Sequence, residues 1–275
     1  MNLIDAVYIH EAGGKELLQI IIEKIEKDKF EFLLDSRLKL QKKYTDSISF
    51  KIIKRGEKNR RNFYMNYAKN YNKVVCLSNV PPPLKISPQV YIYFHNDLLL
   101  STKDSEQSFT NNIILWLKRK YITYKNQRKY IWFVQTNLIK NKLDKSIIKG
   151  KNKILVFPIF RDQIKKIKLE KNPNSYLCVS NHNKHKNIDK LLDAFKLYSL
   201  NNSEPIDLNL TIDKDYFNRN FANIIPNGGS VNVNNHGQLE RKELYKLYEN
   251  SEYYIYPSLR ESLGITLIEA ANYEC

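Results

Sequence analysis

The stretch PSLRESLGITLIE, residues 257–269, places Glu261 and Glu269 eight positions apart, directly after the strand-like run SEYYIYPS. This pattern predicts a strand, a short turn with Pro and Ser, and a helix that opens near Ser262. Such a helix end carries partial positive charge and free backbone amides, which favour an anionic ligand. The amides expected at this end are those of Ser262, Leu263 and Gly264.

Eight residues of helix would carry Glu269 about 12 Å along the axis and roughly 80° around it from Glu261. Both carboxylates could therefore meet one ligand only if it is long and lies beside the helix. A nucleotide diphospho-sugar has that length. The alternative is an ordinary amphipathic helix with two solvated glutamates and a core of Leu263, Leu267 and Ile268.

A second segment upstream shows the same kind of pattern. Residues 176–197, YLCVSNHNKHKNIDKLLDAFKL, predict a strand, a polar loop and a helix that begins after Lys186 and Asn187. A lysine just before a helix N-terminus adds a point charge to the amide donors there, which suits a diphosphate. A loop lysine by itself is more often a solvated charge.

Together the two segments resemble the signature of the retaining GT-B glycosyltransferases of family four, in which the Glu-x7-Glu helix follows a phosphate-contacting lysine by some 75 residues. The resemblance implies that Lys186 neutralises the diphosphate, that Glu261 holds the donor-sugar hydroxyls and that Glu269 holds the ribose. It also implies that backbone near Gly237 contacts the nucleobase and that the transfer, of a hexosyl-type sugar, retains the anomeric configuration.

One position departs from the family. The Gly-Arg pair that many members place after the first strand of the second domain is Ser180-Asn181 in this sequence. The second phosphate-binding cation is therefore in doubt, with Lys184 as the candidate substitute.

Alternating strands and helices fill the rest of the chain and predict α/β architecture with parallel, doubly wound sheets. We expect two Rossmann-like domains of the GT-B kind: an acceptor-side domain over residues 1–165 and a nucleotide-sugar domain over 166–275. Strands are predicted at 6–9, 30–35, 47–53, 73–78, 89–94, 129–134, 153–158, 176–179, 206–212 and 230–239. Helices are predicted after Gly14 and near 61–71, 111–126, 137–148 and 241–251.

Two features of the first half are candidates for the site. Gly13 and Gly14 follow the first strand, and a glycine-rich turn can cradle phosphate, although such a pair usually marks only a tight turn. His95 follows a strand directly, where a parallel sheet presents its ligand-facing residues. The resemblance implies that His95 faces the donor sugar. Gln135 and Thr136 are predicted to add polar contacts.

The sequence stops at AANYEC, soon after Glu269. The family continues with further strands and a terminal helix, so the resemblance covers the whole chain but about three quarters of the family fold. We expect an incomplete second domain whose missing part lies on another chain or is lost, and no transfer by this chain alone. A noncatalytic subunit that binds sugar nucleotides or serves as a scaffold is the alternative.

Charge is concentrated in residues 51–170, which hold 26 Lys and Arg against 7 Asp and Glu within a chain of net charge +16. Basic residues alternate with aromatic ones in WLKRKYITYKNQRKYIWF. This pattern favours an anionic membrane surface, where a lipid-linked acceptor would be found. A nucleic acid is the competing partner, but no recognition helix or stacking platform is evident. A merely solvated basic face is the third possibility.

The remaining signals bear on metals and location. Asp213 and Asp215 form a DxD, the metal-binding pair of another glycosyltransferase fold, but we expect it to be a loop and the donor site to need no metal or other cofactor. Three separated cysteines argue against a disulfide framework. With no 18-residue apolar run and no signal-peptide pattern at the N-terminus, we expect a cytoplasmic enzyme, peripheral at the inner membrane face.

The sequence thus predicts a glycosyltransferase. Its donor would be a nucleotide-sugar, and its acceptor a surface polysaccharide or a lipid-linked glycan.

Overall fold

The computed structural model describes residues 1–100, 109–160, 170–221 and 229–275. The chain divides into two compact units, Met1–Arg161 and Asp162–Cys275, which are treated separately below. The domain boundary predicted between residues 165 and 166 lies outside the described residues.

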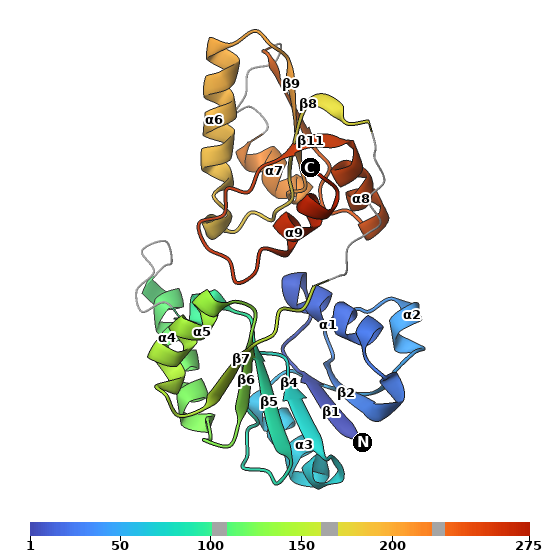
Figure 1. Ribbon diagram of the computed structural model, residues 1–275, viewed down its shortest axis with the longest axis vertical. Helices are drawn as coiled ribbons and strands as arrows, with labels where there is room; N and C mark the ends of the chain where they lie inside the picture. The colour runs from blue at the N-terminus through green and yellow to red at the C-terminus, as the bar shows by residue number, and fades with distance from the viewer. Residues whose placement is uncertain (101–108, 161–169, 222–228) are drawn as a thin grey trace. The chain divides into compact units, whose positions relative to one another are not determined.

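Unit 1 is built on a parallel sheet of seven strands in the order β3-β2-β1-β4-β5-β6-β7 (Figure 1). The order reverses at β1 and β4, which is the doubly wound arrangement. The strands are β1 (Asn2–Ala6), β2 (Phe30–Asp35), β3 (Ser49–Ile53), β4 (Lys73–Cys76), β5 (Gln89–Phe94), β6 (Ile131–Val134) and β7 (Lys153–Val156). The helices are α1 (Ala12–Lys24), α2 (Lys42–Thr45), α3 (Glu57–Tyr67), α4 (Phe109–Lys125) and α5 (Asn137–Leu143), the last continued by a π-helical turn, Asp144–Ile148.

Helices cover both faces of this sheet because successive strand residues are apolar on both sides. In β1, Leu3 belongs to one buried cluster and Ile4 to the other. The first cluster contains Phe63 of α3, and α4 and α5 contribute to it as well. The second contains Leu17 and Leu18 of α1. Each face of the sheet therefore has its own helical layer.

The predicted strands and helices of unit 1 are present, with shifted ends at the first turn. β1 ends at Ala6 instead of Ile9, and Tyr8 has a positive φ of 80°, a conformation that bulky residues avoid. The chain has left the sheet there, so Gly13 and Gly14 lie inside the first turn of α1 and not in a loop before it.

Unit 2 has a parallel sheet of four strands in the order β10-β9-β8-β11. The strands are β8 (Asn172–Cys178), β9 (Ile206–Leu210), β10 (Val231–Asn235) and β11 (Ser251–Tyr254). The helices are α6 (Ile188–Asn201), α7 (Lys214–Asn220), α8 (Arg241–Asn250) and α9 (Ile265–Asn272). Leu192 of α6 packs in one cluster with β9, and Tyr248 of α8 and Ala270 of α9 pack in another with Leu177 of β8. Both units are thus Rossmann-like α/β domains.

Two predictions for unit 2 were wrong in detail. The last helix opens at Ile265 and not near Ser262, because Gly264 is its N-cap in the left-handed conformation with φ of 70°. The DxD is not a loop: Asp213 caps α7 by accepting a hydrogen bond from the amide of Tyr216, and Asp215 lies in the first turn. An aspartate at an N-cap satisfies an otherwise unpaired helix amide.

A buried charged network ties the first strand of unit 1 to α3. The carboxylate of Asp5 accepts hydrogen bonds from Arg60 Nε at 2.8 Å and Tyr64 Oη at 2.6 Å. Arg60 also donates to the carbonyls of Pro81 at 2.8 Å and Val80 at 3.1 Å. Burial alone would lower the pKa of Arg60, but Asp5 outweighs it and holds that pKa well above its usual value.

Removing one member of this network should destabilise the fold strongly, because Asp5 would be left as an uncompensated buried charge. We expect Arg60→Ala to lower the free energy of unfolding by roughly 3–5 kcal/mol in urea denaturation. Arg61→Ala is the matched control, since Arg61 is the exposed neighbour on the same helix, and its loss should stay below about 0.5 kcal/mol. Equal losses for the two variants would contradict a structural role for the pair.

Candidate functional site

The two predicted residues that are 75 positions apart in unit 2 are in direct contact. Lys186 Nζ donates a hydrogen bond to Glu261 Oε1, and the two side chains are 18% and 25% exposed. The backbone fixes this arrangement, since the amide of Leu259 donates to the carbonyl of His185 at 2.8 Å. The loop after β11 is thereby fastened to the loop before α6.

The turn that follows Glu261 depends on its glycine. A Cβ added to Gly264 would lie 2.8 Å from Tyr256 Oη, and the positive φ disfavours any other residue as well. Burial and the neighbouring Glu261 raise the pKa of Tyr256, so its hydroxyl stays protonated. Ser262 and Leu263 lie in this turn, ahead of the helix rather than in its first turn as predicted.

Glu269 occupies a different environment from Glu261. It lies in α9, is 8% exposed and accepts hydrogen bonds from Arg241 Nη1 at 2.5 Å and Tyr248 Oη at 3.3 Å. Arg241 and Tyr248 come from α8, so the carboxylate joins the two helices. Burial raises the pKa of Tyr248. The predicted amphipathic alternative with two solvated glutamates is wrong, because both carboxylates have cationic partners.

Gly237 follows β10 and has a positive φ of 76°. A Cβ there would lie 2.8 Å from Cγ of Lys214, the first residue of α7. Only glycine leaves room for this close approach. Sequence analysis missed Lys214 as a neighbour of the predicted base-contacting backbone, although the capping Asp213 beside it signalled a helix start.

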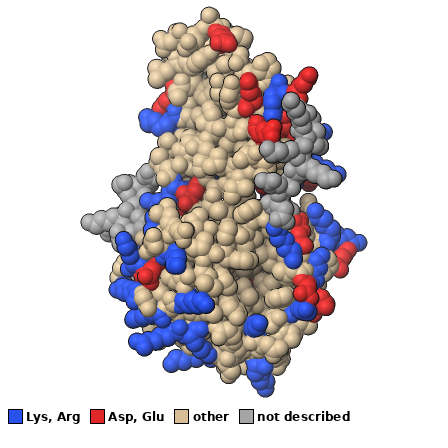
Figure 2. All heavy atoms as spheres, viewed as in Figure 1, with Lys and Arg blue, Asp and Glu red and all other residues tan. Residues whose placement is uncertain are grey.

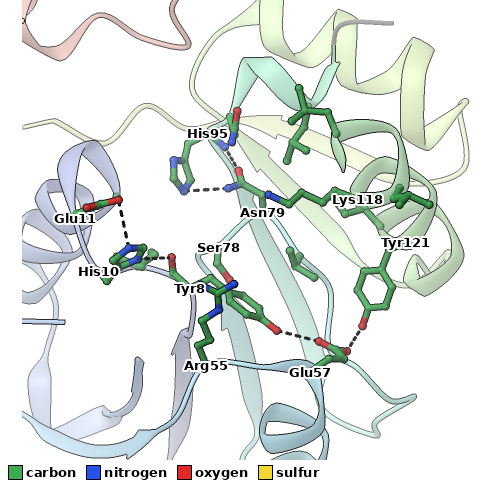
Figure 3. Close-up of a pocket in the computed structure, with 18 of the residues that line it drawn as sticks. Tyr8, His10, Glu11, Arg55, Glu57, Ser78, Asn79, His95, Lys118 and Tyr121 are labelled. Atoms are coloured by element: carbon green, nitrogen blue, oxygen red, sulfur yellow. Dashed lines mark hydrogen bonds and ion pairs between the residues drawn. The ribbon is translucent and has the colours of Figure 1, made fainter. Parts of the chain in front are cut away.

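Unit 1 contains a cavity of about 770 Å³ at the carboxyl ends of β1, β4 and β5 (Figure 3). It lies where the strand order reverses, which is the usual ligand position in an open α/β sheet. The cavity brings Gly14 and His95 together, since a Cβ on Gly14 would lie 3.9 Å from His95 Cε1. Gly13 is not among the residues that line it.

His95 is held by its neighbours in an uncharged form. Its amide donates to Asn79 Oδ1 at 2.6 Å, and its Nε2 lies 2.9 Å from the carbonyl of Leu77. Burial lowers the pKa of His95 from 6.5 to about 4, against the opposing effect of the Leu77 carbonyl. The imidazole therefore offers hydrogen bonds to the cavity at neutral pH but no charge.

A carboxylate on the opposite wall is already occupied. Glu57 accepts hydrogen bonds from Tyr8 Oη at 3.1 Å and from Tyr121 Oη. Burial and Glu57 raise the pKa of Tyr8 to about 12, so the phenol remains a donor. No local sequence pattern indicates this cluster, because its members lie after β1, at the start of α3 and in α4.

The predicted polar contacts after β6 have structural settings. Thr136 caps α5 by accepting a hydrogen bond from the amide of Ile139 at 3.2 Å, and Gln135 is 5% exposed. Neither lines the cavity.

Two further features of the described residues concern metal ions and membranes. Across residues 1–100, 109–160, 170–221 and 229–275, the structure contains no group of three His, Cys, Asp or Glu arranged to hold a metal ion. No helix within these same ranges is both long enough and apolar enough to span a bilayer.

Comparison with known proteins finds a family model that matches unit 2. Residues 160–275 match the sequence model described as glycosyl transferases group 1. A comparison with curated proteins found no match.

Solved structures extend the similarity to both units. The chain is similar to an OtsA apo structure, with 9% identity, a TM-score of 0.62, and coverage of 100% of this chain and 82% of that one. The lipopolysaccharide outer core galactosyltransferase WaaB in its apo form is 13% identical with a TM-score of 0.63, and the match covers 99% of this chain and 78% of WaaB. Anabaena Alr3699/HepE in complex with UDP and glucose is 14% identical with a TM-score of 0.61, and the match covers 98% of this chain and 78% of HepE. These similarities establish the GT-B fold.

The uncharged state of His95 has a measurable consequence. Since its folded pKa is about 4 and its unperturbed value is 6.5, the unfolded state binds the extra proton first as the pH falls. Stability is therefore lost between about pH 6.5 and pH 4 and levels off below, by roughly 1–3 kcal/mol for a partly exposed ring. His95→Asn should remove this contribution in urea denaturation at several pH values. An imidazole titration by NMR with a midpoint near 6.5 would contradict the assignment.

Proposed function

We propose that the protein is a retaining glycosyltransferase that moves a hexosyl-type sugar from a nucleotide-sugar to a surface polysaccharide or a lipid-linked glycan. The direct contact of Lys186 with Glu261 carries the proposal. It joins two segments that are distant in the sequence, within a unit that matches the sequence model of the glycosyl transferases group 1.

In this proposal Lys186 is the principal charge that stabilises the leaving diphosphate, without a metal ion. A preorganised cation aimed at the developing charge lowers the barrier to transfer. To do so, Lys186 exchanges Glu261 for a phosphate oxygen. The exchange releases the Glu261 carboxylate to accept hydrogen bonds from the donor-sugar hydroxyls.

The other residues of unit 2 fit the nucleoside part of the donor. Glu269 is assigned to the ribose, with Arg241 and Tyr248 as positioning residues that hold its carboxylate in one orientation. Backbone at Gly237 is assigned to the base, and Lys214 lies beside it. UDP is a reasonable probe because the similar HepE structure is described as a complex with UDP and glucose.

The acceptor is assigned to the cavity of unit 1. The size of this cavity, about 770 Å³, suits a sugar-sized group, and its polar walls can bind hydroxyls. Gly14 of α1 and the neutral His95 both line this cavity and lie close to each other.

A membrane-bound acceptor is supported by the surface of α4. Ile113, Trp116, Leu117 and Tyr124 follow helical spacing on one side of this helix and are 44%, 51%, 54% and 81% exposed. Lys120 lies in the same stripe, with Nζ 5.6 Å from the Trp116 ring. Lys and Arg gather over the side of unit 1 that carries α4 and α5 (Figure 2). An apolar stripe within a basic surface is typical of helices that lie on anionic membranes at the inner face.

The donor site can be tested with two variants that should change UDP affinity in opposite directions. Lys186→Ala should weaken UDP binding by about 1.5–3 kcal/mol, because a charged hydrogen bond to phosphate is lost. Glu261→Gln should strengthen UDP binding, because it removes the carboxylate that competes for Lys186. Calorimetry on both variants measures the effect. Lys190→Ala is the control, since Lys190 is exposed on α6 and pairs only with the exposed Asp193.

A purely structural ion pair would give a different result. Both Lys186→Ala and Glu261→Gln would then lower the melting temperature and leave UDP affinity unchanged. In that case the donor assignment would be wrong.

The membrane assignment predicts that α4 supplies apolar contacts. Binding to vesicles that contain anionic lipid should fall steeply with rising salt, because the basic side chains act through a screened field. Ile113→Ser with Trp116→Ser should weaken vesicle binding by about tenfold or more at fixed salt. Leu197→Ser with Leu200→Ser is the control, since these α6 leucines are 61% and 63% exposed. Equal binding to zwitterionic and anionic vesicles would contradict the assignment.

A further inference from the structure

We infer that the cavity of unit 1 recognises an anionic group on the acceptor, a phosphate or a carboxylate, through Arg55 and Lys118. The inference rests on the proposed function, because it specifies the chemistry of the acceptor that the cavity would take. Both cations line the cavity, Arg55 from the segment after β3 and Lys118 from α4.

Arg55 and Lys118 have no charged partner of their own. Among the described residues, neither side chain makes a hydrogen bond or an ion pair. In Figure 3 they extend from different walls, Lys118 toward Asn79 and Arg55 toward Tyr8 and Ser78. Two cations that converge on one cavity favour a ligand with negative charge.

The other charged side chains of the cavity each lie against a partner of their own. Arg37 donates to both carboxylate oxygens of Asp35, at 2.9 and 2.8 Å. Glu57 is bound by two tyrosine hydroxyls. Glu11 is 77% exposed and lies 3.3 Å from His10 Nε2. Among the described residues, Arg55 and Lys118 are therefore the lining cations that have no such partner.

A buried polar atom indicates that this cavity is incomplete without a ligand. Ser78 lines the cavity and is 8% exposed, yet its Oγ has no hydrogen-bond partner among the residues that the structure describes. An unpaired buried hydroxyl is costly, and a ligand oxygen would satisfy it. Gly14 also lines the cavity and lies in the first turn of α1, where free amides add partial positive charge.

The experiment measures the affinity of small probes by saturation-transfer NMR in the Lys186→Ala background, which removes the phosphate site proposed for unit 2. The probes are glycerol phosphate, glucuronate, and the neutral compounds glycerol and glucose. Glycerol phosphate and glucuronate separate a phosphate from a carboxylate as the preferred group. We expect at least one of these anions to bind at least tenfold more tightly than its neutral counterpart.

Two pairs of variants then locate the binding. Arg55→Gln and Lys118→Gln should each weaken anion binding by about tenfold. Lys54→Gln and Lys120→Gln are matched controls, because these exposed lysines lie on the same two segments but do not line the cavity. Their effect on anion affinity should stay within about twofold, because exposed charges outside the cavity act on the ligand only through screened attraction.

Ser78→Ala separates ligand binding from folding. Because the hydroxyl has no partner, its removal should leave the melting temperature unchanged or raise it, while anion affinity falls. Equal affinity for anionic and neutral probes would overturn the inference, as would equal losses in the lining and control variants. Calorimetry with UDP on the parent protein reports on the donor site independently, so this failure is distinguishable from failure of the proposed function.

Discussion

The ion pair of Asp5 with Arg60 is the interaction on which the geometry of unit 1 depends. Both side chains are fully buried, so neither charge could be tolerated without the other. Arg60 uses its remaining donors on the carbonyls of Pro81 and Val80, in the connection between β4 and β5 that has no helix of its own. Ser78 and Asn79 belong to this connection and line the cavity. A charge pair in the core therefore sets the position of the cavity wall.

The proposed donor site in unit 2 also contains an ion pair, but one that a ligand is proposed to open. Lys186 and Glu261 also pair, but each keeps part of its surface in contact with solvent, so a ligand can replace either partner. A buried pair such as Asp5 with Arg60 fixes structure because separating it costs several kcal/mol. A partly exposed pair costs little to open, and the lysine and the carboxylate then become available to a diphosphate and to sugar hydroxyls.

Helix α4 has two proposed roles in unit 1, one at the cavity and one at the exposed stripe. One side of it carries Tyr121, Ile122 and Lys118 at the cavity, and the other carries the exposed stripe that contains Trp116, with Leu117 at the boundary of both. Basic and aromatic residues in this segment therefore do not form a single surface. Lys118 is assigned to the acceptor and Trp116 to the membrane, and a variant at each position tests one function without the other.

The sequence by itself determined the alternation of strands and helices, because apolar runs and helical spacing are local properties. It also determined Lys186 and Glu261 as a pair of interest, since their segments carry their own turn and helix signals. Their direct contact, and the retention of Glu269 by Arg241 and Tyr248, were decided only by the tertiary structure. So was the cavity, whose residues come from the segments that follow β1 to β5 and from α4, because a parallel sheet gathers the ends of strands that are distant in the sequence. The start of α9 at Ile265 was missed for a local reason: Gly264 takes a left-handed conformation that Tyr256 enforces from across the turn.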